Sequence, residues 1–407
     1  MRLPRGLRAL CAVAAIVMPL AGTARALPSS EAPASLLVFP LVSVDATAGV
    51  DTVVQLTNTG AAAQSVRCVY IDASLSAAAE SGFVVTLTPA QPLRWRAGAG
   101  LASLPIAGDN SGTIPAVPVT PFSGTLRCVS AQTDGTPSAA DVLIGVATVE
   151  HSAPVDSASY AAIGFAGTGA SADAPEVLVL GGAQAEYAAC PTQSELPLLL
   201  DDAVIDLGAD SAVQRTTSTL IALATCSSRP SLGGAQATVN LVVSNEFGQE
   251  LSFTRSIPEI LITDLSRLDT AVPQQSMFNA ANAGSPHSVV TISPNSSGGG
   301  VLAVALTAFT DPSDASATHR AAVQARVSGD QPLPDLVDLA LPTPAPLSCA
   351  GDCNGDGSVA INELILGVNI ALGTSPLSAC AAIDADGSGS VAINELIAAV
   401  NAALTGC

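Results

Sequence analysis

The sequence contains no lysine and few charged residues of any kind, which together make up 12% of the chain. All 14 basic residues are arginines, and they stand against 34 acidic residues, so the formal net charge is −20. The phosphates of nucleic acids and of anionic lipids repel a chain with this excess of negative charge. We therefore expect neither nucleic acid nor an anionic membrane among its partners.

Aromatic residues and catalytic motifs are also scarce. Aromatic residues make up 3% of the chain, with Trp95 as the one tryptophan, which is a small supply of rings for stacking on sugars. The three histidines, His151, His287 and His319, lie outside any H-E-x-x-H motif, and no G-x-S-x-G motif is present. A pair of catalytic carboxylates, however, is set by three-dimensional spacing. The sequence favours a non-catalytic protein, with an exported polysaccharide-degrading hydrolase as the alternative.

Long apolar runs are absent except near the N-terminus. Three arginines within the first eight residues precede an apolar run at about 9–20, and an Ala-Arg-Ala cleavage signal ends at Ala26. The run is too short to span a bilayer, and this order of segments is typical of a secretory signal peptide. We predict a signal peptide over residues 1–26. The mature protein should begin at Leu27, be secreted to the extracellular space or the cell surface, and not insert into a membrane.

Cysteines are few but evenly numbered in the mature chain. Nine are present, and eight remain once Cys11 is removed with the signal peptide. An even number in an exported protein favours disulfide bonds over reactive thiols. In the front region we expect the pairs Cys68–Cys128 and Cys190–Cys226. The other four crowd into the C-terminal region, at Cys349, Cys353, Cys380 and Cys407.

The region from about residue 36 to 327 consists of short β-branched and apolar segments, such as 52–57 and 83–88, separated by turn residues. Several of these segments alternate apolar and polar residues, which is the pattern of half-buried strands. We predict a mainly β fold with one or two β-sandwich domains, over residues 27–165 and 166–328. Trp95, on an expected strand between two arginines, should pack under a sheet.

Two further features bear on the domain organisation. The strand-turn-strand pattern of residues 52–68 resembles that of 237–254. Either the second β domain is a duplicate of the first, or the two segments are alike only because β-hairpins in general share this pattern. After it, residues 329–348 are rich in proline, a composition that favours extended backbone and a semi-rigid linker. A separate module should therefore begin near residue 349.

The strongest motif in the chain is the twelve-residue segment 352–363, which fits the EF-hand calcium loop at each ligand position. Calcium prefers six to eight hard oxygen ligands, and Gly357 supplies the sharp turn at the sixth position. The expected ligands are the side chains of Asp352, Asn354, Asp356 and Glu363 and the backbone carbonyl of Ser358.

A second loop, 384–395, begins 384 − 352 = 32 residues after the first. Its expected ligands are the side chains of Asp384, Asp386, Ser388 and Glu395 and the backbone carbonyl of Ser390. Each loop runs into an amphipathic segment, 361–372 and 393–404, whose apolar residues recur at helical spacing. The fold class is thus mainly β, followed by a small α-helical module of two paired calcium loops.

Charge placement supports two bound calcium ions. Six acidic residues and no basic residue lie between Cys349 and Cys407, and all six occupy expected ligand positions. An acidic surface would scatter its charges, whereas here the carboxylates would repel one another within each loop in the absence of a cation.

Two calcium loops about 32 residues apart, each followed by a helix, resemble a type I dockerin over residues 349–407. The resemblance implies calcium binding and attachment to a cohesin domain of an extracellular complex. Three features depart from the family: glutamate at the last ligand position of each loop, four added cysteines, and Ile-Asn pairs at 361–362 and 393–394. Because that family recognises its partner at these pairs, the expected partner is a cohesin-like domain or another extracellular protein.

The repeat also predicts the arrangement of the module. Pseudo-twofold packing of two loop-helix units places the end of the last helix near the start of the first loop. Cys407 should then pair with Cys349 or Cys353, and Cys380 with the other of the two. The helix faces that carry matching asparagines should form the docking surface; these are Asn362, Asn369, Asn394 and Asn401.

Overall fold

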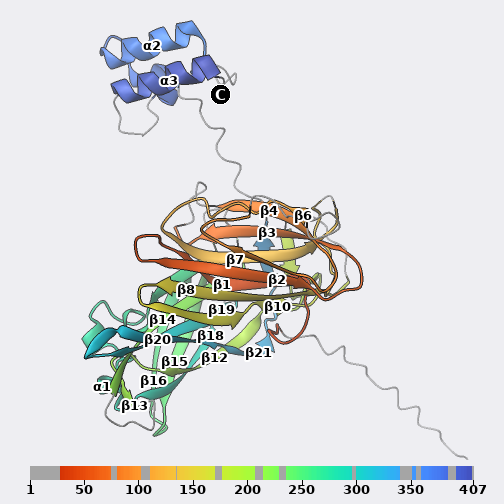
Figure 1. Ribbon diagram of the computed structural model, residues 1–407, viewed down its shortest axis with the longest axis vertical. Coiled ribbons are helices and arrows are strands. Elements are labelled where there is room, and N and C mark those ends of the chain that lie inside the picture. The colour runs from red at the N-terminus through yellow and green to blue at the C-terminus, as the bar shows by residue number, and fades with distance from the viewer. Residues whose placement is uncertain are drawn as a thin grey trace, which may run out of the picture.

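The computed structural model describes residues 28–74, 80–101, 111–133, 135–169, 177–206, 214–228, 235–295, 299–339, 351–353, 359–383 and 391–405. The expected signal peptide lies outside these residues. The fold is mainly β, as predicted, and its sheets are antiparallel. We call residues 28–339 the β body and residues 351–405 the tail (Figure 1). No helix of the described residues is long and apolar enough to cross a membrane.

The first half of the β body consists of two sheets packed face to face. The six-stranded sheet has the order β10 (Ile163–Phe165), β1 (Leu36–Val44), β7 (Phe122–Ala131), β3 (Gln64–Asp72), β4 (Ser81–Leu87) and β6 (Ser111–Gly112). The four-stranded sheet has the order β5 (Pro92–Arg96), β2 (Val50–Asn58), β8 (Leu143–Ser152) and β9 (Val155–Ala161).

Side chains that alternate along these strands form the core between the two sheets. Strand β5 shows this alternation clearly, because Leu93 and Trp95 are buried and their neighbours are exposed. The indole Nε1 of Trp95 donates a hydrogen bond of 2.7 Å to the Tyr70 hydroxyl on the opposite sheet. The ring of Trp95 also meets that of Phe83 edge-on at 5.9 Å. The prediction that Trp95 packs under a sheet is confirmed.

The second half of the β body has the same two-layer plan. One sheet has the order β16 (Glu250–Pro258), β15 (Gln236–Asn245), β18 (His287–Pro294), β12 (Pro191–Leu199) and β21 (Arg326–Asp330). The other contains β13 (Val204–Asp206), β14 (Gln214–Thr225), β19 (Val301–Asp311) and β20 (Asp314–Gln324), and β17 (Ile260–Asp264) also pairs with β14. Three short helices, η3 (Leu265–Arg267), η4 (Pro273–Gln275) and α1 (Ala280–Ala283), lie between β17 and β18.

The resemblance between residues 52–68 and 237–254 does not extend to their topology. Strands β15 and β16 form a hairpin, as the pattern suggests. Strands β2 and β3 instead lie in different sheets, because β2 pairs with β5 and β8. The side-chain amide of Asn58, which ends β2, donates to the carbonyls of Ala62 (2.7 Å) and Leu87 (3.1 Å). These bonds anchor the crossing between the two sheets where a simple hairpin was expected.

The proline-rich segment after residue 329 contributes a strand before it leaves the β body. Strand β22 (Asp335–Asp338) pairs with β11 (Val177–Leu180) in a two-stranded sheet. The extended backbone that proline favours is also the geometry of a strand, and burial of Val337 and Leu339 holds the segment in place. The second β region therefore continues into the range predicted to be a linker, and residues 340–348 lie outside the described part of the chain.

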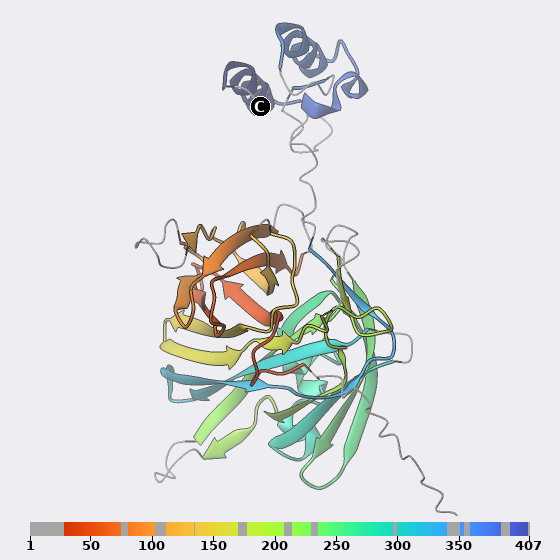
Figure 2. The same cartoon turned by 90° about the vertical axis from the view of Figure 1, so that its right-hand side faces the viewer.

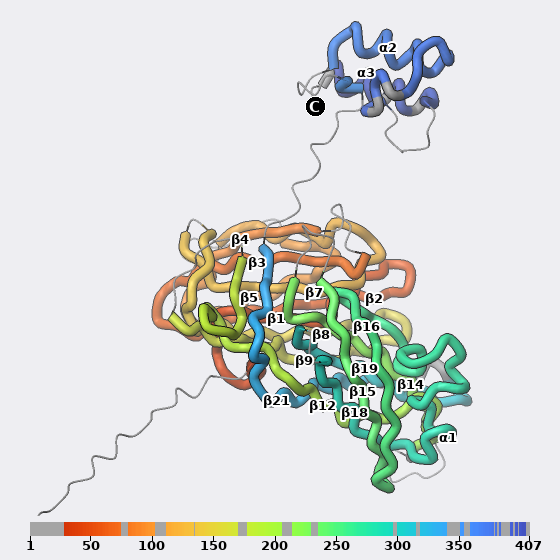
Figure 3. The backbone as a smooth tube through the Cα atoms, turned by 180° about the vertical axis from the view of Figure 1, so that it is seen from behind, coloured from red at the N-terminus to blue at the C-terminus, as the bar shows by residue number. Residues whose placement is uncertain are grey.

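The two halves of the β body share a continuous interface (Figures 2 and 3). A buried apolar cluster combines Leu36 and Ile71 of the first half with Leu178, Ile260 and Val337 of the second. Polar contacts cross the same interface: the Arg320 guanidinium lies 3.5 Å from Asp156, and the Gln324 amide donates to the carbonyl of Ala161 at 2.9 Å. The buried apolar surface and these polar contacts hold the halves as one unit.

The disulfides agree with the sequence-based pairing. Cys68 and Cys128 lie directly opposite each other on β3 and β7 and are bonded, as are Cys190 and Cys226. In the tail Cys353 is bonded to Cys380, which is one of the two pairings left open by the repeat. Cys349 and Cys407 lie outside the described residues. Three disulfides fit an extracellular or otherwise oxidising environment.

In the tail, two helices pack on a small core (Figure 1). Helix α2 (Ile361–Ala371) and helix α3 (Ile393–Thr405) are joined through η5 (Leu377–Ala379) and η6 (Ala381–Ile383). The core contains Ile370, Ile383 and Ala399 together with the Cys353–Cys380 disulfide. Helices α2 and α3 begin at Ile361 and Ile393, the first residues of the two segments expected to be helical.

Candidate metal centre

Three of the ten expected calcium ligands lie within the described residues: Asp352, Glu363 and Glu395. The other seven lie outside them, at Asn354, Asp356, Ser358, Asp384, Asp386, Ser388 and Ser390. The described three are the first ligand of one loop and the last ligand of both loops.

Glu363 connects the two ends of the first loop. Its Oε1 accepts a hydrogen bond from the backbone N–H of Cys353 at 2.9 Å, and its Oε2 accepts one from Ala360 at 2.8 Å. The bond to Ala360 caps the first turn of α2, where the helix dipole also favours a negative charge. Each carboxylate oxygen has two lone pairs, so an oxygen that accepts one of these hydrogen bonds can also contact a cation.

Glu395 repeats this arrangement at the start of α3. Its Oε2 accepts a hydrogen bond from the backbone N–H of Ala392 at 2.7 Å, as Glu363 does from Ala360. The same local sequence, Val-Ala-Ile-Asn-Glu, thus produces the same capped helix start twice. The structure places both of these expected ligands in equivalent positions.

The start of the first loop is also held by the segment that connects α2 to α3. The backbone N–H of Gly351 donates to the carbonyl of Ala382 at 3.0 Å, and the Cys353–Cys380 disulfide holds its two Cα atoms 4.8 Å apart. Gly351 has a φ of +98°, and a Cβ there would lie 2.7 Å from the Cβ of Ala399. Only glycine fits this close approach, which positions Asp352 against the core of the tail.

Burial of these carboxylates is the feature that points to a cation. Asp352 is 9% exposed, Glu363 3% and Glu395 2%. Moving an ionised carboxylate out of water costs several kcal/mol unless a positive charge compensates it, yet the segment from Cys349 to Cys407 has no basic residue. Hard oxygen donors of this kind suit calcium, so the described residues fit the ion that the loop motif predicts.

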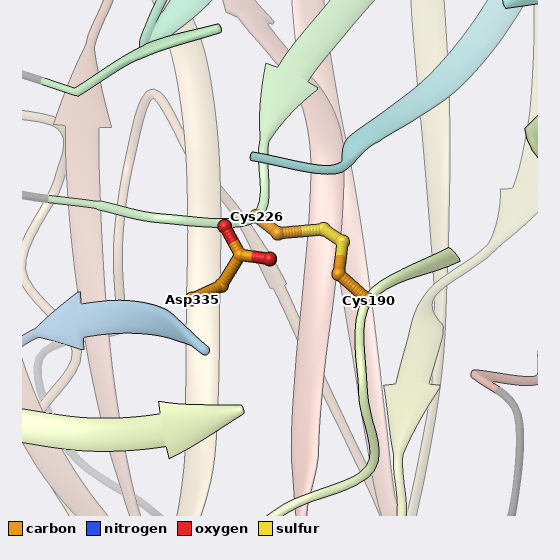
Figure 4. Close-up of side chains that lie close together, drawn as sticks. All are labelled: Cys190, Cys226 and Asp335. Carbon is orange, nitrogen blue, oxygen red and sulfur yellow. A yellow bond between two sulfur atoms is a disulfide. The ribbon is translucent and has the colours of Figure 1, made fainter. Parts of the chain in front are cut away.

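A second group of metal-ligating residue types lies in the β body, where Cys190, Cys226 and Asp335 come within 4.8 Å of one another (Figure 4). The two sulfurs are bonded to each other, so neither offers the thiolate that a metal needs. The carboxylate of Asp335 instead accepts a hydrogen bond from the Ser227 hydroxyl at 2.6 Å. Burial raises the pKa of Asp335 above its usual value. This group is a disulfide beside a buried acid.

Asp335 belongs to a larger set of charges buried between the halves of the β body. At its centre is Arg127 on β7, which is 1% exposed and donates to the backbone carbonyls of Cys226 (2.9 Å) and Thr225 (2.8 Å). Burial lowers the pKa of Arg127, while Glu259 and Asp335 oppose this shift. Sequence reasoning missed this cluster, and its one signal was an arginine at a core position of an apolar strand.

Glu80, beside the same interface, carries a testable pH dependence. Burial, together with the charges of Glu259 and Asp338, raises the pKa of Glu80 from 4.5 to about 7. Because the folded pKa lies above the unfolded one, the stability that protonation contributes is complete below pH 4.5 and is lost as the pH rises through about 7. Over this pH range, we expect the free energy of unfolding of the wild type to fall by about 1 to 3 kcal/mol more than that of Glu80→Gln.

The measurement is urea unfolding of wild type and Glu80→Gln between pH 4.5 and 8, taking the difference between them at each pH. Taking the difference cancels the contributions of other buried acids, including Asp201 and Asp335, whose pKa values are also raised by burial. Glu250→Gln, on the exposed start of β16, is the matched control. A difference that is constant with pH would contradict the role of Glu80.

The alternative function, a hydrolase, needs a pair of carboxylates that lie close together, and two carboxylates line one surface pocket of the β body. A surface pocket of about 620 Å³ is lined in part by Asp51, Glu150 and Arg96. Arg96 lies 2.6 Å from Glu150 and 3.9 Å from Asp51, and Arg94 lies 3.6 Å from Glu150. The two carboxylates and the two guanidinium groups form an ion-pair network on the outer face of a sheet.

No family model and no curated protein matches the chain. Among solved structures, the apo form of a Pleurotus ostreatus lectin is similar at 11% identity and a TM-score of 0.11, covering 75% of this chain and 88% of the lectin. A TM-score this low carries no argument about fold or function.

Proposed function

We propose that this chain is an exported, non-catalytic protein that serves adhesion or display through its two β-sandwich domains and attachment through its tail. In this proposal the tail is a dockerin-like module that binds two calcium ions, one in each loop. The carrying observation is the burial of Asp352, Glu363 and Glu395 in a segment that has no basic residue. Calcium then both neutralises these carboxylates and fixes the two helices relative to each other.

Attachment is proposed to occur on the outer faces of α2 and α3, to a cohesin-like domain or another extracellular protein. Asn362 and Asn401, two of the four matching asparagines, are exposed on these faces. The repeated sequence places asparagines at the same positions of both helices, so in this proposal either helix can offer the same side chains to a partner. The β body connects to this tail through the proline-rich segment and would be displayed by it.

Calorimetric titration of the mature protein with calcium tests the proposal. We expect two ions per chain, with dissociation constants between about 10⁻⁷ and 10⁻³ M for loops with three carboxylates each. Asp352→Ala with Glu363→Ala should remove one ion, and Glu395→Ala should remove or strongly weaken the other. Glu250→Ala, in the β body, is the control and should leave both. An unchanged stoichiometry in the Asp352 and Glu363 variant would show that the first loop is not a calcium site.

A further inference from the structure

One end of the Cys353–Cys380 disulfide lies inside the first of the two proposed calcium loops. Cys353 is the second residue of the loop 352–363 and directly follows Asp352, the first expected ligand. Its sulfur is bonded to that of Cys380, between η5 and η6, and the two Cα atoms are 4.8 Å apart. The disulfide therefore fixes the backbone of the loop next to an expected ligand.

The backbone of Cys353 also holds the last expected ligand of this loop, because its N–H donates the 2.9 Å hydrogen bond to Oε1 of Glu363. On the other side of Asp352, the backbone N–H of Gly351 donates to the carbonyl of Ala382 at 3.0 Å. The segment that contains Ala382 thus holds the residue before Asp352 by a hydrogen bond and the residue after it by the disulfide. The disulfide is consequently connected to both the first and the last expected ligand of the loop.

The sequence repeat does not include this disulfide. The second loop, 384–395, contains no cysteine and has Ala385 at the position that Cys353 occupies in the first loop. The residue that corresponds to Cys380 in the first unit, at position 380 − 32 = 348, is Ser348. The ligand positions and helix starts of the two units otherwise match closely. The second loop is therefore an internal comparison for the effect of the disulfide on the first.

The environment of the tail disulfide differs from that of the two disulfides in the β body. Cys380 packs in the core of the tail and is 2% exposed, whereas Cys353 is half-buried. The cysteines of the β body are at most 1% exposed; these are Cys68, Cys128, Cys190 and Cys226. Of the three described disulfides, the one in the tail is thus the one that a small thiol in solvent reaches most easily.

Ligands that are held in place before an ion arrives bind it more tightly, because less conformational freedom is lost on binding. Cys353 supplies this support through its hydrogen bond to Glu363 and through the covalent bond that positions the start of the loop. Without the constraint, repulsion between the buried carboxylates of Asp352 and Glu363 favours a more open loop. Loss of a group that orients a metal ligand typically weakens metal binding by about 10- to 100-fold.

We propose that the Cys353–Cys380 disulfide positions the ligands of the first loop, and that calcium and this disulfide stabilise each other. The proposal rests on the proposed function, because it requires that the first loop binds calcium. Such coupling is reciprocal: the factor by which the disulfide strengthens calcium binding is also the factor by which calcium makes the disulfide harder to reduce. The tail then reaches its calcium-loaded form most readily where calcium and an oxidising environment occur together, as outside the cell.

Reduction by a dithiol such as dithiothreitol is the chemical step that reveals the coupling. The S–S bond breaks and thiols form at Cys353 and Cys380, while the dithiol gives up two electrons and two protons and closes to a cyclic disulfide. For this two-electron couple, a tenfold coupling corresponds to a shift in reduction potential of about 30 mV. A coupling of 10- to 100-fold therefore corresponds to about 30 to 60 mV.

Calorimetric titration with calcium compares the full mature protein with Cys353→Ser, Cys380→Ser. We expect the affinity of the first loop to fall about 10- to 100-fold further than that of the second. Repeating the comparison in Glu395→Ala, which keeps the first loop, and in Asp352→Ala with Glu363→Ala, which keeps the second, assigns the affected loop. Equal weakening of both loops would mean that the disulfide only stabilises the fold of the tail, and overturns the proposal.

Redox titration of the wild type tests the same coupling without a cysteine variant that has to fold. The full protein is equilibrated in dithiothreitol buffers with and without saturating calcium, free thiols are alkylated, and mass spectrometry gives the oxidised fraction of each disulfide. Calcium should lower the potential of Cys353–Cys380 by about 30 to 60 mV and leave Cys68–Cys128 and Cys190–Cys226 unchanged. An unshifted tail disulfide, or an equal shift of all three, contradicts the coupling.

The same measurements separate this inference from the proposed function. A wild-type protein that binds no calcium contradicts the proposed function, whereas one that binds two ions with affinities independent of the disulfide contradicts only the inference. In Asp352→Ala with Glu363→Ala, which retains the second loop, calcium should no longer shift the potential of Cys353–Cys380. A shift that persists in this variant would mean that the coupling does not run through the first loop, and overturns the positioning role.

Discussion

Replacing Arg127 with methionine should lower the free energy of unfolding of the β body by about 3 to 5 kcal/mol, the usual cost of removing one member of a buried charge set. The methionine chain fills much of the same volume but supplies no donor. Two backbone carbonyls, of Thr225 and Cys226, would lose their hydrogen bonds. Glu259 and Asp335 would also remain buried without the positive charge that now attracts them.

Urea unfolding followed by the fluorescence of Trp95 measures this effect, because this one tryptophan lies in the core of the β body. Arg326→Met, at an exposed arginine on β21, is the matched control and should change stability by no more than about 0.5 kcal/mol. Adding Glu259→Gln or Asp335→Asn to the Arg127→Met variant should recover part of the loss. A loss below about 1 kcal/mol, or no recovery, would show that the charges do not interact as inferred.

This interface explains why the two halves of the β body act together. Arg127 comes from β7 of the first half, whereas the two carbonyls it bonds belong to the last residue of β14 in the second half and the residue after it. Arg67, on β3, likewise donates to the carbonyl of Leu339 at 2.9 Å, just after β22. Polar groups buried in this way are satisfied only when the halves meet in one relative position. They consequently specify that position more sharply than apolar contact would.

Local features of the chain were predictable from sequence because they depend on nearby residues. The expected strand 52–57 lies within β2 and the expected strand 83–88 nearly coincides with β4, since period-two alternation records which side chains face a core. The starts of α2 and α3 follow from the repeated Ile-Asn-Glu segments in the same way. The loop motif predicts calcium ligands at Asp352, Glu363 and Glu395, and this stays a prediction.

Long-range features were less accessible. The sequence of β2 gives no sign that it pairs with β5 and β8 and not with β3, because strand order is set by contacts between distant segments. The burial of Arg127 depends on contacts with the second half of the β body, so the sequence around Arg127 does not predict it. The disulfide between Cys68 and Cys128 was predictable because the number of alternatives in the front region was small.

Removing calcium should unfold the tail while leaving the β body folded, and this is the largest effect expected of the molecule. A ligand at a thousandfold excess over its dissociation constant stabilises the folded form by about 4 kcal/mol per site, so two sites contribute about 8 kcal/mol. The buried carboxylates of Asp352, Glu363 and Glu395 give the physical reason, since burial of their negative charge is costly and the segment from Cys349 to Cys407 has no basic residue to offset it. Chelation leaves the Cys353–Cys380 disulfide intact. This disulfide restricts the unfolded tail, but it supplies no positive charge to offset the carboxylates.

The composition of the chain allows both parts to be followed in one sample of the full protein. Every aromatic residue lies before residue 349, so Trp95 fluorescence reports the β body, whereas helical circular dichroism comes mainly from α2 and α3. Chelation should lower the midpoint of the helical transition by more than about 15 °C for a module of this size and leave the Trp95 transition unchanged. Glu363→Gln with Glu395→Gln should reproduce the chelated state in saturating calcium, and Glu250→Gln should not. A helical transition that is indifferent to chelation would mean that the tail folds without metal, which would contradict a role for calcium in its stability.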